Sequence, residues 1–292
     1  MQVLRVPYGH PDSPKMFCES LRKTGFAVIS NHPVSYALIS EVFAEWAKFF
    51  AGETKFKYHF DTSTQEGYFP FKTENAKGYA LKDLKEFFHM YVRTGTPEGM
   101  SPKTREMFNQ MQALATELLS WIQTSSPKEV SAKFSIPLTT MTENSQETLL
   151  RVLHYPPLTS VEDEGAIRAA AHEDINLITL LPAATAPGLQ VKDLQGNWIE
   201  VECNPGDMVI NAGDMLQEAS GGYYVSTTHR VMNPSGPAAK LSRYSMPVFM
   251  HPRFDVKLSD RYSAGSYLDQ RLREIGLLKP NETKFTPKES LA

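Results

Sequence analysis

The chain has 292 residues, of which 41% are hydrophobic, 22% are charged and 11% are aromatic, and its formal net charge at pH 7 is −3. These proportions are typical of a globular protein with a full core, and they exclude a disordered chain. The sequence contains no Lys/Arg-rich run, RNA-binding signature or zinc-finger spacing, so we expect no nucleic-acid partner.

Cysteine content and the N-terminus indicate a compartment. Cys18 and Cys203 are the two cysteines, and neither belongs to a C-x-x-C motif, so no disulfide framework is expected. The N-terminus lacks the charged-then-apolar pattern of a signal peptide, and no apolar run is long enough to span a bilayer. We therefore expect a cytoplasmic protein that does not bind a membrane.

The first 147 residues are expected to form helices with a few strands. A cap and first-turn pair at Ser13-Pro14 and a stop at Gly25 predict a short helix, and the run 26–29 predicts a strand after it. Apolar residues at helical spacing predict two longer helices, over 38–50 and from Ser101-Pro102 to about residue 122. Aromatic clusters between 67 and 92 predict strands.

After a polar loop at 139–147, the pattern changes to short strands separated by turn residues. The predicted strands are Leu149–Tyr155, Ile175–Leu181, Leu189–Lys192, Trp198–Glu200, Met208–Asn211, Tyr223–Ser226 and Leu241–Met250. Many short strands with frequent Gly, Asp and Asn turns indicate a sandwich or a barrel. A last helix is predicted after Ser263, and the polar tail from Lys279 is expected to be loose.

Two metal-capable side chains lie in the stretch 171–181, which otherwise has the character of a buried strand. Because side chains alternate in an extended segment, His172 and Asp174 are expected to project to one face while Glu173 points to the other. One imidazole and one carboxylate are two-thirds of a 2-His-1-carboxylate site, which leaves open positions on an Fe(II). An H-x-D is common by chance, so the hypothesis needs a third ligand.

His229 is the best candidate for that third ligand. It belongs to the β-rich segment 223–231, and the chain from Asp174 contains enough strand-sized runs to cross a sheet and return beside the first strand. His172, Asp174 and His229 could therefore meet. The alternative is that His229 is a hydrogen-bonded core histidine and that the H-x-D is a coincidence.

The segment 241–249 indicates an anion site. Arg243 and Ser245 share a face with apolar residues, and a guanidinium in such surroundings needs an anionic partner. Its planar fork suits a carboxylate, to which the adjacent hydroxyl could donate one more hydrogen bond. Tyr155, at the end of a predicted strand, could join the same anion. The alternatives are an internal Arg–Asp or Arg–Glu pair and simple core packing of the tyrosine.

Four blocks of this chain, in this order, resemble the bacterial branch of the isopenicillin N synthase-like family of Fe(II)/2-oxoglutarate-dependent oxygenases. The blocks are His172–Pro182, Gly213–Gln217, Ser226–Val231 and Arg243–Ser245. The segments 24–32, 83–89 and 268–272 also resemble bacterial members. The resemblance thus covers nearly the whole chain.

The resemblance implies a mainly β fold, with a double-stranded β-helix (jelly-roll) core flanked by N-terminal helices and a C-terminal helix. It implies a single catalytic domain over residues 1–292. We expect this domain to divide into an N-terminal helical and strand region (1–147), the jelly-roll core (148–252) and a C-terminal helix and tail (253–292).

The resemblance also implies Fe(II) held by His172, Asp174 and His229. In such a site 2-oxoglutarate would chelate the metal, and its distal carboxylate would meet Arg243, Ser245 and Tyr155. One metal position would remain for O2. The implied enzyme is an oxidoreductase, a dioxygenase that hydroxylates, desaturates or cyclises a small organic substrate and forms succinate and CO2. The cofactor carries the hard chemistry, and the protein orients it.

Departures from the family pattern leave alternatives open. Leu153-His154-Tyr155 stands where members often carry Asn-x-Tyr, so the Asn and any hydrogen bond from it to the cosubstrate are missing. Isopenicillin N synthase and aminocyclopropane-carboxylate oxidase carry the Arg-x-Ser pair but do not use 2-oxoglutarate. A same-fold Fe(II) oxidase that takes its electrons from substrate and ascorbate is therefore the nearest alternative. A non-enzymatic β-sandwich binding protein is a third interpretation.

The substrate and the oligomeric state are not predicted by the sequence. Aromatic candidates for a substrate wall are Tyr68, Phe87 and Phe249, with His89 and Gln217 as polar candidates. Simple packing or strand filling is the more common reason for each of these residues.

Overall fold

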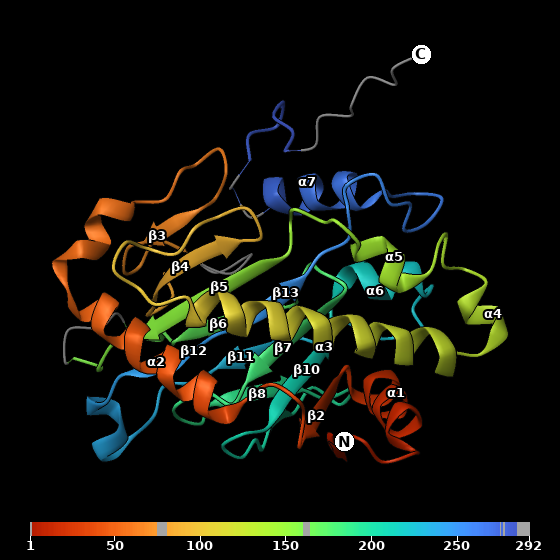
Figure 1. Ribbon diagram of the computed structural model, residues 1–292, viewed down its shortest axis with the longest axis horizontal. Coiled ribbons are helices and arrows are strands. Elements are labelled where there is room, and N and C mark those ends of the chain that lie inside the picture. Colours follow the sequence, from red (N-terminus) through yellow and green to blue (C-terminus); the bar gives the residue numbers. More distant parts are fainter. Residues whose placement is uncertain (1, 75–80, 160–163, 275, 277, 285–292) are drawn as a thin grey trace.

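The computed structural model describes residues 2–74, 81–159, 164–274, 276 and 278–284, and its strands form two β-sheets (Figure 1). The larger sheet contains β1 (Leu4–Pro7), β2 (Phe26–Ser30), β3 (Gly67–Phe69), β4 (Glu86–Tyr91), β5 (Leu149–Tyr155), β7 (Ile178–Pro182), β10 (Met208–Ala212), β12 (Arg243–Ser245) and β13 (Val248–Met250). Its order is β1-β2-β10-β7-β13-β5-β4-β3, and β12 also pairs with β5. The smaller sheet contains β6 (Ala169–His172), β8 (Leu189–Lys192), β9 (Trp198–Glu200) and β11 (His229–Val231), in the order β6-β11-β8-β9.

Alternation along the strands of the larger sheet creates two separate cores. In β2, Phe26 and Val28 pack with Val191 and Val231 of the smaller sheet, so apolar side chains fill the space between the sheets. The intervening residues of β2 point to the opposite face, which helices cover. Two sheets packed face to face make the jelly-roll core, and the prediction of a mainly β fold is confirmed.

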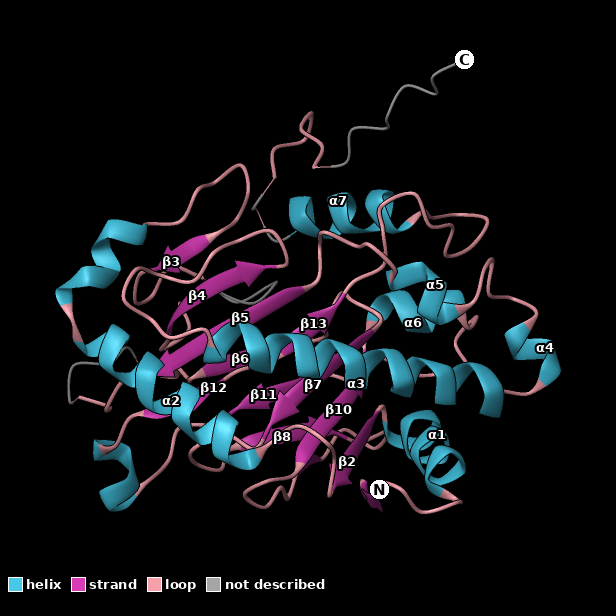
Figure 2. Cartoon of the chain, viewed as in Figure 1, coloured by secondary structure: helices cyan, strands magenta, loops and turns pink. Residues whose placement is uncertain are grey.

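Helices cover the outer face of the larger sheet, as Figure 2 shows for the long helix that crosses it. The helices are α1 (Ser13–Thr24), α2 (Tyr36–Ala51), α3 (Lys103–Ser125), α4 (Lys128–Ser131), α5 (Leu138–Thr142), α6 (Asp214–Ala219) and α7 (Ala264–Glu274), with 3-10 turns η1 (Glu53–Tyr58) and η2 (Gly236–Lys240). Trp46 of α2 lies 5.1 Å from Phe88 of β4, measured between ring centroids. The predicted N-terminal helices and C-terminal helix are confirmed. In the described part of the chain, no helix combines the length and the apolarity that crossing a membrane requires.

The end of α1 is fixed by a glycine. Gly25 has φ 72°, a left-handed conformation that costs glycine little, and its N–H donates to the carbonyl of Leu21. A Cβ atom at this position would lie 2.2 Å from Oγ1 of Thr227 and 2.7 Å from the carbonyl oxygen of Val225. The helix end therefore packs directly against the chain just before β11.

The structure corrects the predicted strand over the H-x-D stretch. His172 is the last residue of β6, Asp174 lies in a connection, and β7 begins only at Ile178. The physical reason is that β6 and β7 belong to different sheets, so the chain must leave one sheet and enter the other between these residues. Same-face alternation within one strand is thus not what brings His172 and Asp174 together.

Two further strand predictions are wrong. The segment 223–226 forms bends and loop, because Gly221 and Gly222, with φ 63° and 82°, turn the chain before it. The predicted strand 241–250 is divided into β12 and β13, which pair with different parts of β5 on either side of Met246-Pro247. Proline has no N–H to donate to a sheet, which accounts for the interruption. Helix α6 was not predicted.

Candidate metal centre

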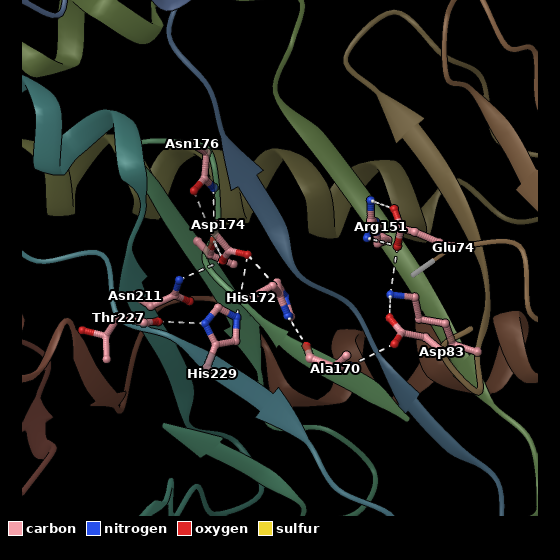
Figure 3. A network of polar contacts seen from close by, with 12 residues as sticks. Glu74, Asp83, Arg151, Ala170, His172, Asp174, Asn176, Asn211, Thr227 and His229 are labelled. Atoms are coloured by element: carbon pink, nitrogen blue, oxygen red, sulfur yellow. Dashed lines mark hydrogen bonds and ion pairs between the residues drawn. The ribbon is translucent and has the colours of Figure 1, made fainter. Parts of the chain in front are cut away.

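Three potential metal ligands converge where the smaller sheet meets the connection to the larger one (Figure 3). His172 of β6 and His229 of β11 are direct partners in the antiparallel register, with ring centroids 4.4 Å apart. Oδ1 of Asp174 lies 3.8 Å from Nε2 of His172 and 3.7 Å from Nε2 of His229. One ligand atom from each residue falls within 4.8 Å of the other two.

Backbone carbonyls orient both imidazole rings. The Nδ1–H of His172 donates to the carbonyl of Ala170 over 2.8 Å, and the Nδ1–H of His229 donates to the carbonyl of Thr227 over 3.1 Å. Because a carbonyl can only accept, each ring must carry its proton on Nδ1, which leaves the Nε2 lone pair free. Metal-binding histidines are commonly fixed in this way.

One carboxylate oxygen of Asp174 accepts hydrogen bonds from the protein, and the other faces the two histidines. Its Oδ2 accepts hydrogen bonds from Oγ1 of Thr179 at 2.5 Å and from Nδ2 of Asn211 at 2.8 Å. Burial favours a raised pKa for Asp174, but the two imidazoles and these hydrogen bonds outweigh it and bring the pKa below its usual range. Asp174 is therefore a carboxylate whose Oδ1 faces the histidines.

The donor set fits a divalent transition metal. Burial lowers the pKa of His172 to about 4, so this ring is neutral near pH 7. A neutral imidazole and an ionised carboxylate are the protonation states that metal binding requires. Two imidazole nitrogens and one carboxylate oxygen match the 2-His-1-carboxylate set of Fe(II) oxygenases.

The predicted anion-binding residues lie together on two paired strands. In the register of β12 and β5, Arg243 is opposite Tyr155, and Ser245 is opposite Leu153. Arg243, Ser245 and Tyr155 are all buried. The guanidinium carbon of Arg243 lies 5.1 Å from the centre of the Tyr155 ring.

Arg243 has no internal anion in the described part of the chain. Its Nε–H donates to the carbonyl of Ala186 over 2.9 Å, while its buried Nη1 has no hydrogen-bond partner. Burial lowers the pKa of this guanidinium, and the neighbouring Tyr155 partly opposes that effect. The alternative of an internal Arg–Asp or Arg–Glu pair is therefore not seen among the residues that the structure describes.

A cavity of about 300 Å³ lies beside the candidate ligands. His172 and Asp174 line it, and Phe249 and Leu268 contribute to an apolar wall. Of the five residues considered for a substrate wall, Phe249 and His89 line this cavity. The other three are used elsewhere: the hydroxyl of Tyr68 donates to Glu86, Phe87 stacks on Phe69, and the side-chain oxygen of Gln217 accepts the N–H of Ser226.

Another part of the cavity lining, the charged wall, is a network of charged side chains that the sequence did not predict. Nζ of Lys85 lies 2.8 Å from Oδ2 of Asp83 and 2.9 Å from Oε2 of Glu74. Nη1 of Arg151 lies 3.2 Å from the same oxygen of Glu74. Burial would raise the pKa of Glu74, but Arg151 and Lys85 hold it well below its usual range. The charges of this wall therefore balance one another.

One residue, Ala170, connects this charged wall to the metal ligands through its backbone N–H and carbonyl groups, as Figure 3 shows. Oδ1 of Asp83 accepts the N–H of Ala170 over 3.0 Å, and the carbonyl of Ala170 accepts the Nδ1–H of His172. No local pattern signals this connection, because Asp83 and Ala170 are 87 residues apart in the chain.

His89 makes a pH-dependent contribution to stability that can be measured. Its Nε2 accepts the Nε–H of Arg151 over 2.7 Å, and its Nδ1–H donates to the carbonyl of Gln65 over 2.9 Å. Burial and the charge of Arg151 keep the pKa of His89 well below its usual value. In the unfolded chain the His89 side chain becomes protonated as the pH falls through about 6.5, whereas in the folded protein it stays neutral there. The free energy of unfolding therefore decreases as the pH drops below about 6.5.

We expect His89→Gln to reduce the pH dependence of stability. The free energy of unfolding, measured by urea denaturation of the metal-free protein at pH 7, 6 and 5, should fall less steeply in the variant, by up to about 1.4 kcal/mol per pH unit. The quantity compared is the slope of the free energy of unfolding against pH, because the substitution also lowers stability by an amount that is present at every pH. His10→Gln, which makes the same substitution at an exposed histidine, is the control variant. Equal slopes for His89→Gln and wild type would contradict the assignment.

Two family descriptions match this chain. Residues 146–252 match the 2OG-Fe(II) oxygenase superfamily, and residues 14–113 match the N-terminal region described as non-haem dioxygenase in morphine synthesis. The first range contains all three candidate metal ligands.

Individual proteins resemble the chain over most of its length. The proline hydroxylase buaE of Petromyces alliaceus is 31% identical over 267 residues, which covers 82% of this chain and 81% of that protein. The crystal structure of a provisionally named oxygenase from Shewanella oneidensis is 50% identical, with a TM-score of 0.86, over 95% of this chain and 100% of that one. The 2-oxoglutarate binary complex of the Arabidopsis thaliana dioxygenase for auxin oxidation 1 shares the fold, with 19% identity, a TM-score of 0.71 and coverage of 88% and 96%.

Proposed function

Because the chain belongs to the 2OG-Fe(II) oxygenase superfamily and is a 2-oxoglutarate-dependent dioxygenase, we propose that its Fe(II) is held by His172, Asp174 and His229. The observation that carries this assignment is the convergence of two Nε2 atoms and one Oδ1 atom, with the second polar atom of each side chain already hydrogen-bonded. When bound, Fe(II) supplies the activation of O2 that couples the decarboxylation of 2-oxoglutarate to oxidation of the substrate.

The protein's own contribution at the metal is orientation. The carbonyls of Ala170 and Thr227 keep both rings in the tautomer that offers Nε2. Asn211 and Thr179 donate hydrogen bonds to Oδ2 of Asp174, so that only Oδ1 of the carboxylate remains to bind the metal. Such supporting hydrogen bonds commonly change metal affinity or activity by about 10- to 100-fold when they are removed.

The distal carboxylate of 2-oxoglutarate is assigned to Arg243, Ser245 and Tyr155. The buried guanidinium with an unpartnered Nη1 supports this proposal, because a cation in such surroundings is stabilised by an anion. A guanidinium can bind both oxygens of a carboxylate at once, and a tyrosine or serine hydroxyl can add a further hydrogen bond.

We propose that the substrate is a small organic molecule that binds in the cavity of about 300 Å³ beside His172 and Asp174. The apolar wall around Phe249 would exclude water from the reacting atoms, and the charged wall would contact polar groups of the substrate. Hydroxylation, desaturation and ring closure are the outcomes open to this site.

The proposal is tested first on the wild-type protein. Anaerobic addition of Fe(II) and then 2-oxoglutarate should give a visible charge-transfer band, and admission of O2 should give succinate in proportion to the 2-oxoglutarate consumed. If neither the band nor oxygen-dependent succinate forms, the assigned site is wrong. Turnover that proceeds without 2-oxoglutarate would instead indicate an oxidase that uses substrate and ascorbate.

We also propose that the protein works in the cytoplasm. Both cysteines, Cys18 and Cys203, are free thiols, as is usual in a reducing compartment. Fractionation of cells that produce a tagged protein tests this, and recovery outside the cytoplasm would contradict it.

A further inference from the structure

A second buried arginine lies beside Arg243. Arg168 stands immediately before β6 and is 1% exposed, while Arg243 is 2% exposed. Both guanidinium groups lie over the ring of Tyr155, with the carbon of Arg168 at 5.9 Å and that of Arg243 at 5.1 Å from the ring centre. Two buried cations therefore share one aromatic side chain.

Neither cation has a negative partner among the described residues. Arg168 donates through Nη2 to the carbonyl of Leu241 over 3.1 Å, and its Nε is buried without a partner, as is Nη1 of Arg243. Backbone carbonyls satisfy hydrogen bonds but do not neutralise a charge. Two unpaired like charges inside a protein are unfavourable, because each is desolvated and each repels the other. Burial, followed by the charge of Arg243, lowers the pKa of Arg168.

Two carboxylates at or next to β4, the strand that pairs with β5 and its Tyr155, are already committed to other cations. Glu86 pairs with Lys55 and accepts a hydrogen bond from His154, and Asp83 pairs with Lys85. Among the residues that the structure describes, the surroundings of Tyr155 therefore keep an excess of positive charge that no carboxylate balances. A ligand with a negative end is the natural complement.

We infer that Arg168 is a second guanidinium of the cosubstrate site, so that the distal carboxylate of 2-oxoglutarate binds between Arg168 and Arg243 beside Tyr155. This inference rests on the proposed function of Arg243. Arg168 directly precedes β6, and His172 ends it four residues later. The segment 168–172 therefore contributes to the metal end of the cosubstrate site through His172 and to the distal end through Arg168. The two arginines select dicarboxylates against 2-oxo acids that lack a distal carboxylate.

Steady-state kinetics provide the first test. We expect Arg168→Met to raise the KM for 2-oxoglutarate by about 10- to 100-fold, the usual range for losing a hydrogen bond to a charged group. The kcat at saturating 2-oxoglutarate should stay close to wild type, because Arg168 lies at the distal end of the cosubstrate. Arg168→Lys keeps the charge and should recover part of the loss. A fall in kcat with an unchanged KM would overturn the inference.

Equilibrium binding gives a readout that does not depend on turnover. Titration calorimetry on protein loaded with Zn(II) compares glutarate, which has both carboxylates, with oxalate, which can occupy only the metal end. Arg168→Met should weaken glutarate and 2-oxoglutarate and leave oxalate unchanged. A purely structural role for Arg168 would weaken all three or none.

A matched control and the wild type separate the possible failures. Arg105→Met removes another guanidinium that donates to a backbone carbonyl, that of Thr94, from α3, and it should bind every ligand as wild type does. If wild-type protein neither binds nor consumes 2-oxoglutarate, the proposed function fails. If wild type does both and Arg168→Met retains its affinity for 2-oxoglutarate and glutarate, only the role of Arg168 fails.

Discussion

Asp174→Asn is expected to abolish stoichiometric Fe(II) binding and to lower oxygen-dependent succinate formation by at least about 1,000-fold, because even residues that only support metal ligands commonly contribute 10- to 100-fold. The substitution preserves the size of the side chain and removes its charge. Thr179 and Asn211 would then face a neutral group, and the two histidines would lose the anion 3.7 to 3.8 Å from their Nε2 atoms.

Metal content and spectroscopy measure this effect. Iron in the anaerobically reconstituted protein, measured after desalting, should fall from about one equivalent to a background level, and the charge-transfer band with 2-oxoglutarate should be absent. Asp193→Asn, which alters a half-buried turn carboxylate, is the control. Far-UV circular dichroism verifies that the variant is folded. A folded Asp174→Asn variant with full iron content would refute the assignment.

Arg243→Met is expected to raise the KM for 2-oxoglutarate by about 100-fold or more, since truncating one partner of a buried charge pair commonly costs 2–5 kcal/mol. Fe(II) binding should persist, because the proposed ligands lie on β6, on β11 and in the connection from β6 to β7, whereas Arg243 lies on β12. The variant thus separates loss of cosubstrate from loss of metal.

The rate of succinate formation by Arg243→Met and by the wild type is measured at several 2-oxoglutarate concentrations. Iron content is determined in the same preparation, and high 2-oxoglutarate should recover much of the activity. An unchanged KM would show that the distal carboxylate binds elsewhere. Loss of iron together with activity would show instead that Arg243 supports the fold around the metal.

Local patterns predicted the elements whose neighbours are close in sequence. The strands Leu149–Tyr155, Leu189–Lys192 and Trp198–Glu200 have the predicted bounds, because strong β-formers lie between clear turn residues. The segment 223–226 is also rich in β-formers, but it is not a strand. The preceding glycines turn the chain, so that the segment does not pair with a neighbouring strand. Strand propensity needs a neighbouring strand to be realised.

The convergence of the three candidate ligands was predicted through residue chemistry more successfully than through local structure. His172, Asp174 and His229 do meet, although the extended strand that was expected to align the first two is not there. Arg168 was missed because an arginine before a run of alanines gives no sign of burial. The pairing of Glu74 with Arg151 was missed because it joins residues 77 positions apart, and only the tertiary fold brings them together.

The glycine at the end of α1 bears on how small a working version of this protein can be. Gly25 leaves room for Thr227 to approach the helix end, and the carbonyl of Thr227 orients His229. The next strand, β2, pairs with β10 inside the larger sheet. Residues 24–30 therefore belong to the scaffold of the metal centre as fully as residues 146–252 do. A shortened protein that begins after β2 would keep all three proposed metal ligands. It would lose the packing of Gly25 against Thr227, the residue whose carbonyl orients His229.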